Sequence, residues 1–384
     1  MSNLFTLSQT PSRLHSIDGL RAIAASLVFA HHLGVATTGA TLTVHGNTFV
    51  GNLLSGLTAS GVELFFVISA IVLVGPYVRQ ERTIRIGSYA WRRVERLLPP
   101  YLAAWMLAGM TIYLASAYPT WWTTTANLPA FDLVDWIAQA GIFYFGTKLF
   151  NFAWWSLSVE VTFYLLVPAL VPLFAQMRRR SRGLVFTFIA SICLATLTNV
   201  VSVATLNSIP ILRNLALYSS CFCAGLILAC TSLPMRISLA LTALGITWVL
   251  ASSAYPLINQ HVGWGIFYFG IVAIVMDRTT RLSKWLSSFA FVWLGERSYS
   301  LFLVHYSAIG LACYASSFLF EEKNFGYMIF SRLASLAMTM GITIFVFHFV
   351  ERRFARNLET AENVLPRQTV TGWKSNRGQR GSAE

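Results

Sequence analysis

Long apolar runs alternate with short polar segments along most of the chain. Each run has about 20 residues, the length that an α-helix needs to cross the hydrocarbon core of a bilayer. The pattern therefore predicts ten membrane-spanning helices. They lie near residues 17–37, 56–78, 97–117, 154–175, 184–206, 212–231, 237–254, 262–276, 289–313 and 328–350.

The composition supports an all-α polytopic membrane protein. Of 384 residues, 55% are hydrophobic and 11% are charged, and the mean hydropathy is +0.60. These values exclude a soluble enzyme, a nucleic-acid binder and a secreted disulfide scaffold. The cysteines lie in apolar stretches without a metal-like spacing, so we expect neither a disulfide nor a metal site.

The net charge of +13 is spread unevenly over the loops. Lysine and arginine gather at residues 79–96, 178–182 and 277–284 and after residue 352, whereas the opposite side carries only Lys148, Arg213 and Lys323. Because cytoplasmic loops retain positive charge, both termini are predicted to be cytoplasmic. We expect a membrane-embedded domain over residues 1–355 and a basic, disordered tail over 356–384.

The segment FDLVDWIAQAGIFYFGTKLF, residues 131–150, tests this topology. Asp132, Asp135 and Gln139 interrupt its start, and a further span here would move the arginine cluster at 178–182 to the outside. We therefore predict a re-entrant or interfacial helix on the outer face, in addition to the ten spans.

Ionisable side chains at membrane depth are costly and mark candidate functional sites. In the first span, Arg21 and His32 are 11 residues apart, which places them on one helix stripe about 16 Å apart along the axis. His31 points away from that stripe and is expected to be structural. Alternatively, His32 is a neutral inter-helix hydrogen-bonding group and Arg21 pairs with Asp18.

Further acidic and histidine side chains fall within predicted spans. Glu160 follows a tryptophan pair, Glu63 lies near the end of the second span, and His305 lies over halfway along its helix. By the predicted topology, these three residues and His32 all lie in the outer half of the bilayer. A catalytic cavity could form there, although an interfacial position also explains Glu63.

The arginine-rich loop 79–96 lies on the predicted inner face. Positive-inside bias and anionic lipid account for such a cluster in many membrane proteins. As a functional element it would hold a phosphate-bearing donor, because guanidinium groups pair with phosphate oxygens.

Six segments, in this order, resemble the acyltransferase 3 family of integral membrane acyltransferases over about residues 15 to 355. They are SIDGLRAIAASLVFAHHL, SGVELFFVISAIVL, RRVERLLPPYL, WWSLSVEVTFYLLVPAL, LGERSYSLFLVHY and FVERRF. Two positions depart from the usual pattern: Ala70 replaces a glycine, and Arg353 stands where proline is more common.

The resemblance implies transfer of an acyl group, usually acetyl, from cytoplasmic acyl-CoA to a hydroxyl of a glycan, a lipid-linked sugar or a small molecule. No permanently bound cofactor is implied. Matched motif by motif, the family's arginine and histidine pair falls on Arg21 and His32, and its acidic residue on Glu160. The loop arginines fall on Arg92, Arg93 and Arg96.

Transfer to a hydroxyl needs a base, and histidine suits that task. We predict His32 as the base, although an acyl-histidine intermediate is an open alternative. Arg21 would orient the donor, and Glu160 would orient His32 or bind the acceptor. Glu63 and His305 are secondary candidates for acceptor binding.

An envelope polysaccharide or its lipid-linked precursor is the expected acceptor, and a bacterial inner membrane is the expected location. A transporter or flippase, with the histidine, glutamate and arginine side chains as a relay, is the main alternative. Consumption of the thioester would distinguish the two functions.

Overall fold

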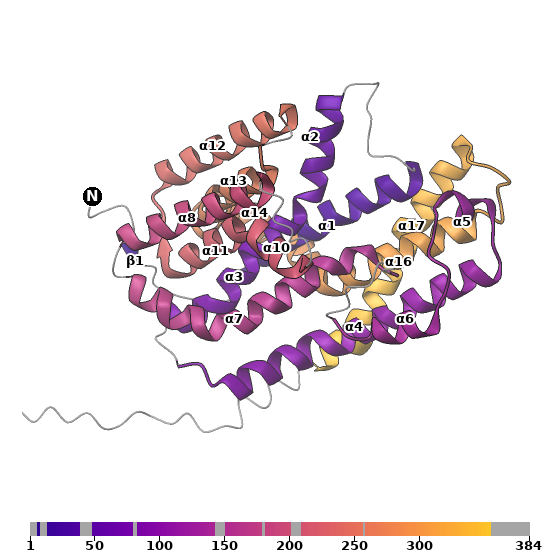
Figure 1. Cartoon of the computed structure of the whole chain (residues 1–384), viewed down its shortest axis with the longest axis horizontal. Coiled ribbons are helices and arrows are strands. Elements are labelled where there is room, and N and C mark those ends of the chain that lie inside the picture. Colours follow the sequence, from indigo (N-terminus) through magenta and orange to yellow (C-terminus); the bar gives the residue numbers. More distant parts are fainter. Residues whose placement is uncertain are drawn as a thin grey trace, which may run out of the picture.

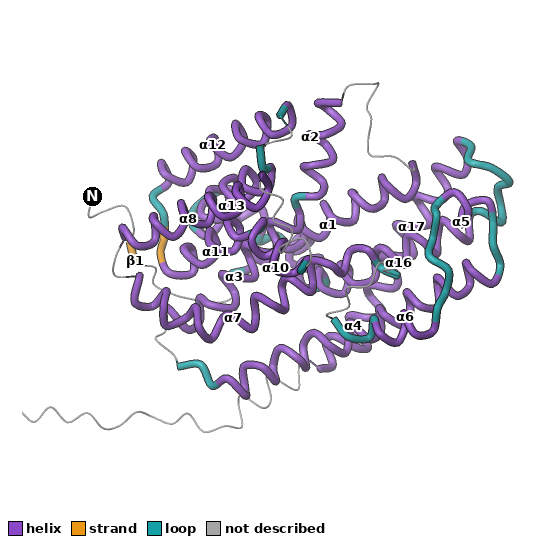
Figure 2. The backbone as a smooth tube through the Cα atoms, in the orientation of Figure 1, coloured by secondary structure: helices purple, strands orange, loops and turns teal. Residues whose placement is uncertain are grey.

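The computed structural model describes residues 6–7, 14–38, 48–79, 83–142, 150–178, 181–200, 209–255 and 258–354, and nearly all of them are helical (Figures 1 and 2). The helices are α1 (His15–Thr38), α2 (Thr48–Ala59), α3 (Gly61–Arg79), α4 (Ile86–Ala117), α5 (Trp121–Thr125), α6 (Leu133–Ala138), α7 (Trp155–Met177), α8 (Ser181–Val200), α10 (Pro210–Leu217), α11 (Ser219–Cys230), α12 (Met235–Ala254), α13 (Gln260–Met276), α14 (Arg281–Leu286), α15 (Phe289–Glu296), α16 (Ser298–Ser316) and α17 (Phe325–Val346). The predicted tail, 356–384, lies outside the described residues.

In the described residues, each of the ten predicted spans falls on a helix or on a pair of consecutive helices; residues 201–206 of the span 184–206 lie outside the described residues. Six of the described helical stretches are long and apolar enough to cross a membrane, and a seventh is obtained if α10 and α11, bent by 56°, form one span. The prediction of an all-α membrane protein is confirmed. The count of ten and the cytoplasmic termini stay predictions; α13, for example, has only 17 residues.

The outer helices expose large apolar side chains. Phe186 on α8 is 72% exposed, Leu333 on α17 is 63% exposed and Leu165 on α7 is 69% exposed. A soluble monomer rarely exposes apolar patches of this extent, whereas lipid tails cover them at no cost. These helices therefore present a lipid-facing surface.

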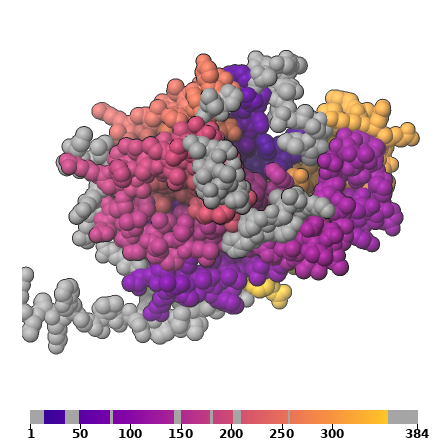
Figure 3. All heavy atoms as spheres, in the orientation of Figure 1, coloured from indigo at the N-terminus to yellow at the C-terminus, as the bar shows by residue number. Residues whose placement is uncertain are grey.

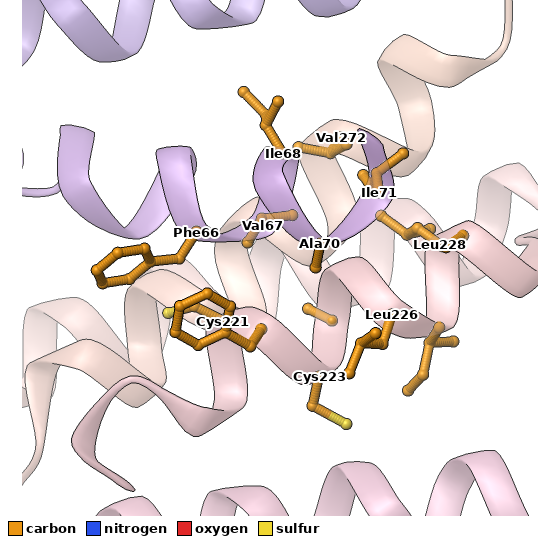
Figure 4. Close-up of a cluster of buried hydrophobic side chains, with 14 of the residues drawn as sticks. Phe66, Val67, Ile68, Ala70, Ile71, Cys221, Cys223, Leu226, Leu228 and Val272 are labelled. Carbon is orange, nitrogen blue, oxygen red and sulfur yellow. The ribbon is translucent and has the colours of Figure 1, made fainter. Parts of the chain in front are cut away.

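Helix α3 is the centre of the main core and packs against α1, α7, α11 and α13. Figure 4 shows Val67 and Ala70 of α3 facing Cys221 and Leu226 of α11. Gly225 of α11 permits this approach, because a Cβ at that position would overlap the Val67 carbonyl oxygen and the Ala70 side chain. Ala70 thus stands at a tight helix crossing.

The segment 131–150 does not form one long helix in its described part. Asp132 caps α6, which ends at Ala138, and residues 139–142 form turns. Trp136 of α6 stacks on Trp105 of α4, with ring centroids 4.3 Å apart. The polar start thus makes a six-residue helix that lies against α4. Residues 143–149 lie outside the described residues.

Helix α7 begins inside the protein and not at an outer surface. Asn151 and the Trp154 indole both donate hydrogen bonds of 3.2 Å to the Leu303 carbonyl in α16, and both residues are buried. A short 3₁₀ turn, Phe152–Trp154, leads into α7. The start of the helix, which carries Glu160 five residues further on, is therefore held against α16.

Two arginines at helix ends bind carbonyl groups of neighbouring helices. Arg79, the last residue of α3, donates to the Leu228 and Ala229 carbonyls at 2.7 and 2.9 Å, at the end of α11. Arg178 donates to the Val78 carbonyl at 2.7 Å. These bonds satisfy carbonyls that the last helical turn leaves unpaired. A two-residue strand pair, β1 (Thr6–Leu7) with β2 (Thr231–Ser232), lies beside them.

Replacement of Gly225 with alanine is expected to destabilise the protein by about 1–3 kcal/mol, because the added methyl overlaps the α3 backbone. The melting temperature of the detergent-purified variant would report the change. Gly341→Ala on α17 is the matched control, since nothing lies within 4 Å of a Cβ there. Equal melting temperatures for the two variants would contradict the tight α3–α11 crossing.

Candidate functional site

Helix α1 runs without a break through both residues of the predicted stripe. Arg21 and His32 therefore lie on one face, about 16 Å apart along the axis, as the spacing predicts. His31 points elsewhere, and its Nδ1 lies 3.2 Å from the Thr58 hydroxyl of α2. The two adjacent histidines thus have different surroundings in the structure.

His32 and His305 come together between α1 and α16. The His305 Nε2 lies 3.1 Å from the His32 Nδ1, and the ring centroids are 5.0 Å apart. Tyr306 packs edge-on against His32, with centroids 5.3 Å apart. His305 is fully enclosed, whereas His32 is half-buried. Sequence reasoning identified both residues but not their contact.

Two backbone carbonyls determine the protonation pattern of this pair. His305 Nδ1 lies 2.7 Å from the Phe302 carbonyl, and His32 Nδ1 lies 2.9 Å from the Val28 carbonyl. Because a carbonyl only accepts, each neutral ring carries its proton on Nδ1. The His305 Nε2 then accepts from His32 Nδ1, and the lone pair of His32 lies on its Nε2.

A narrow cavity of about 80 Å³ lies between α1, α3, α4, α7 and α16. Its charged lining consists of Arg21, Arg93, Arg96 and Glu160. Arg21 is also 4.0 Å from Asp18, so the expected ion pair and the cavity position coexist. The Arg93 Nε is buried and, within the described part of the chain, has no hydrogen-bond partner. The cavity is therefore rich in guanidinium groups.

Glu160 belongs to this cavity and has partners other than His32. Its Oε1 accepts hydrogen bonds from the Ser69 hydroxyl at 2.5 Å and from the Tyr164 hydroxyl at 2.6 Å. The predicted orientation of His32 by Glu160 finds no counterpart among these contacts. The difference arises because α7 starts beside Leu303, so Glu160 reaches the arginine cavity.

Two aromatic rings lie between the arginine cavity and the histidine pair. Phe65 and Phe302 line the cavity and meet edge-to-face, with centroids 5.8 Å apart. The Phe302 ring also lies 5.8 Å from the His305 ring. The site therefore has two adjacent compartments, the arginine cavity and the histidine pair, and these rings separate them.

Two other predicted residues lie away from both compartments. Arg92 does not line the cavity, and one of its guanidinium nitrogens lies 3.4 Å from the Tyr77 hydroxyl. Glu63 is buried, and its Oε1 is 2.7 Å from the Nδ1 of His261 on α13. The structure thus brings together His32 with His305, and Arg21 with Arg93, Arg96 and Glu160.

Several buried polar residues of the site were not anticipated. Tyr164 lies four residues after Glu160, and this helical spacing could have indicated the contact. Glu351, in a π-helical turn (Phe347–Glu351), accepts from the Ser300 hydroxyl at 2.6 Å, and its charge acts on Arg21 and Arg96. His261 stands at the edge of an apolar run, so the sequence marks it as a loop residue.

Removal of the Tyr164 hydroxyl by Tyr164→Phe is expected to lower the free energy of unfolding by about 1.5 kcal/mol, because the Glu160 carboxylate loses a buried donor. Thermal melting in detergent would measure it. Tyr113→Phe is the control, since Tyr113 is 54% exposed. A melting temperature equal to that of the control would show that the hydrogen bond does not stabilise the fold.

The chain is similar to known bacterial proteins. It is 24% identical over 391 residues to a predicted O-acetyltransferase of Staphylococcus aureus strain COL, covering 94% of this chain and 60% of the relative. It is 26% identical over 339 residues to the O-acetyltransferase OatA of Staphylococcus aureus strain NCTC 8325, covering 78% of this chain and 51% of OatA.

The chain therefore spans between about half and two thirds of the length of these two relatives. No solved structure matches it. The sequence profile of the acyltransferase 3 family, an acyltransferase domain, matches residues 14–350. That match covers both compartments of the site, and the chain belongs to this family of membrane acyltransferases.

Proposed function

We propose that the protein is a membrane O-acyltransferase that moves an acyl group, acetyl in the first instance, from acyl-CoA to a hydroxyl of an envelope glycan or lipid-linked sugar. Family membership and the names of the relatives support acyl transfer to oxygen. Because those relatives are bacterial, we extend the proposal to a bacterial inner membrane, with both termini in the cytoplasm.

The observation that carries the proposal is the hydrogen-bond order at the histidine pair. The Val28 carbonyl accepts from the His32 Nδ1 at 2.9 Å, and the His305 Nε2 is a second acceptor of the same proton at 3.1 Å. The His32 Nε2 is then an unprotonated nitrogen on a half-buried ring. A general base needs such a lone pair. His305 is a positioning residue here, since it acts on the reaction through His32.

In the proposed step, His32 Nε2 takes the proton of the acceptor hydroxyl while that oxygen attacks the thioester carbonyl carbon. The carbon–sulfur bond breaks, and the CoA thiolate receives the proton from the His32 imidazolium. The ester is formed and His32 returns to its neutral state. Throughout this step the other proton of His32 stays on Nδ1, and the His305 Nε2, 3.1 Å away, accepts a hydrogen bond from it.

The arginine cavity supports an anionic donor. Arg21, Arg93 and Arg96 face one carboxylate, Glu160, so the lining carries an excess of positive charge. The unpartnered Arg93 Nε is a buried donor that a phosphate oxygen would satisfy. The thioester end would then extend past Phe65 and Phe302 toward His32. Arg92, with its Tyr77 contact, contributes to the edge of the donor site at most.

Loss of the base in His32→Ala is expected to reduce acetyl-CoA hydrolysis by water at least about 100-fold, the range for loss of a general base. Purified protein in nanodiscs and free CoA as the readout would measure it. His348→Ala, at an exposed histidine, is the control and should match the wild type. Intact acetyl-CoA with wild-type protein would overturn the proposal and favour the transporter.

Arg96→Gln is expected to raise the KM for acetyl-CoA about tenfold or more, because a charge-assisted hydrogen bond contributes about 1.5–3 kcal/mol. The kcat should change less than the KM. Arg85→Gln, at an exposed arginine before the same helix, is the matched control. A KM unchanged in Arg96→Gln but raised in Arg85→Gln would place the donor outside the cavity.

A further inference from the structure

A second cavity lies at the opposite end of α3 from Arg79. It has a volume of about 330 Å³, within the range of small-molecule sites, and it is formed by α2, the ends of α8 and α12 and the start of α13. Figure 3 shows the atoms of α12 beside those of α2 at the top of the molecule. By the predicted topology, this is the outer face.

The lining of this cavity is unusually polar for a membrane domain. Polar side chains line it from four helices: Asn52 and Ser55 from α2, Asn199 from α8, Ser252 and Ser253 from α12, and Gln260 and His261 from α13. None of the described lining residues is lysine, arginine or a carboxylate. Such a surface offers donors and acceptors in similar numbers and does not select for an anion.

Buried groups beneath the cavity also favour a neutral, hydrogen-bonding ligand. Glu63, 3% exposed, holds His261 at 2.7 Å, so the one carboxylate close to the lining is paired. The buried Trp264 indole N–H has no hydrogen-bond partner in the described part of the chain. A Cβ added at Gly56, a lining residue, would lie 3.7 Å from this nitrogen. A donor is therefore available near the cavity wall.

The cavity is connected to the histidine site through α2. Thr58 of that helix contacts His31, the neighbour of His32, while Ser55, Gly56 and Ala59 line the cavity. The cavity lining and the contact with His31 thus share one helix, α2. An acceptor with several units could occupy the cavity with one unit and present a hydroxyl to His32 with another.

We propose that this cavity binds a sugar unit of the acceptor, a neutral polyhydroxylated ligand. The proposal rests on the proposed function, because the ligand is taken to be part of the acyl acceptor. Paired hydroxyl and amide groups suit the alternating donors and acceptors of a sugar ring. The arginines that favour an anion in the other cavity have no counterpart among the described residues of this lining.

The test fills the cavity with Ser252→Trp and uses Leu250→Trp, at a lipid-exposed position of the same helix, as the matched control. Two readouts are needed: acetyl-CoA hydrolysis by the purified proteins, and alkali-labile acetate on the envelope glycan fraction of cells producing each variant. Asn52→Ala and Gln260→Ala remove the amides without adding bulk.

Ser252→Trp is expected to reduce glycan acetate about tenfold while acetyl-CoA hydrolysis stays at the wild-type level, which also shows that the variant folds. The amide variants should lose glycan acetate in part. Wild-type glycan acetylation in Ser252→Trp and in both amide variants would overturn the sugar site. Wild-type protein that hydrolyses acetyl-CoA but leaves the glycan unmodified would also overturn it. Absence of hydrolysis in the wild type would instead overturn the proposed function.

Discussion

Polar groups inside this bundle must find partners within the protein, because the surrounding hydrocarbon offers none. Arg79 and Arg178 bind the carbonyls at the ends of neighbouring helices, and Asn151 and Trp154 bind the Leu303 carbonyl. These bonds hold helix ends against neighbouring helices, and those of Asn151 and Trp154 hold the start of α7 against α16. The same requirement leaves each histidine of the pair with its proton on Nδ1, where a backbone carbonyl accepts it.

Two residues of α1 therefore lie in different compartments of the site. Arg21 stands in the compartment that suits an anionic donor, and His32 stands in the compartment that suits proton transfer. The Phe65 and Phe302 rings lie between the two and meet edge-to-face. A single straight helix fixes their separation, so the distance does not depend on loops.

Helix positions were predictable from the sequence because apolar length and charge bias follow directly from the bilayer. The Arg21–His32 stripe was predictable for the same reason, since both residues share one helix. Contacts between helices were not predictable from the sequence. The pairing of His32 with His305 and of Glu63 with His261 depends on packing between distant segments. The contact of Glu160 with Ser69 likewise depends on how α7 packs against α3.

Phe302 contributes both its ring and its backbone carbonyl to the site, and the ring can move without the carbonyl. Its ring closes the passage between the compartments, whereas its backbone carbonyl holds the His305 proton. Rotation about χ1 moves the ring and leaves the carbonyl where it is. A rotamer change at this one side chain would thus open the way for a thioester without altering the protonation of the base.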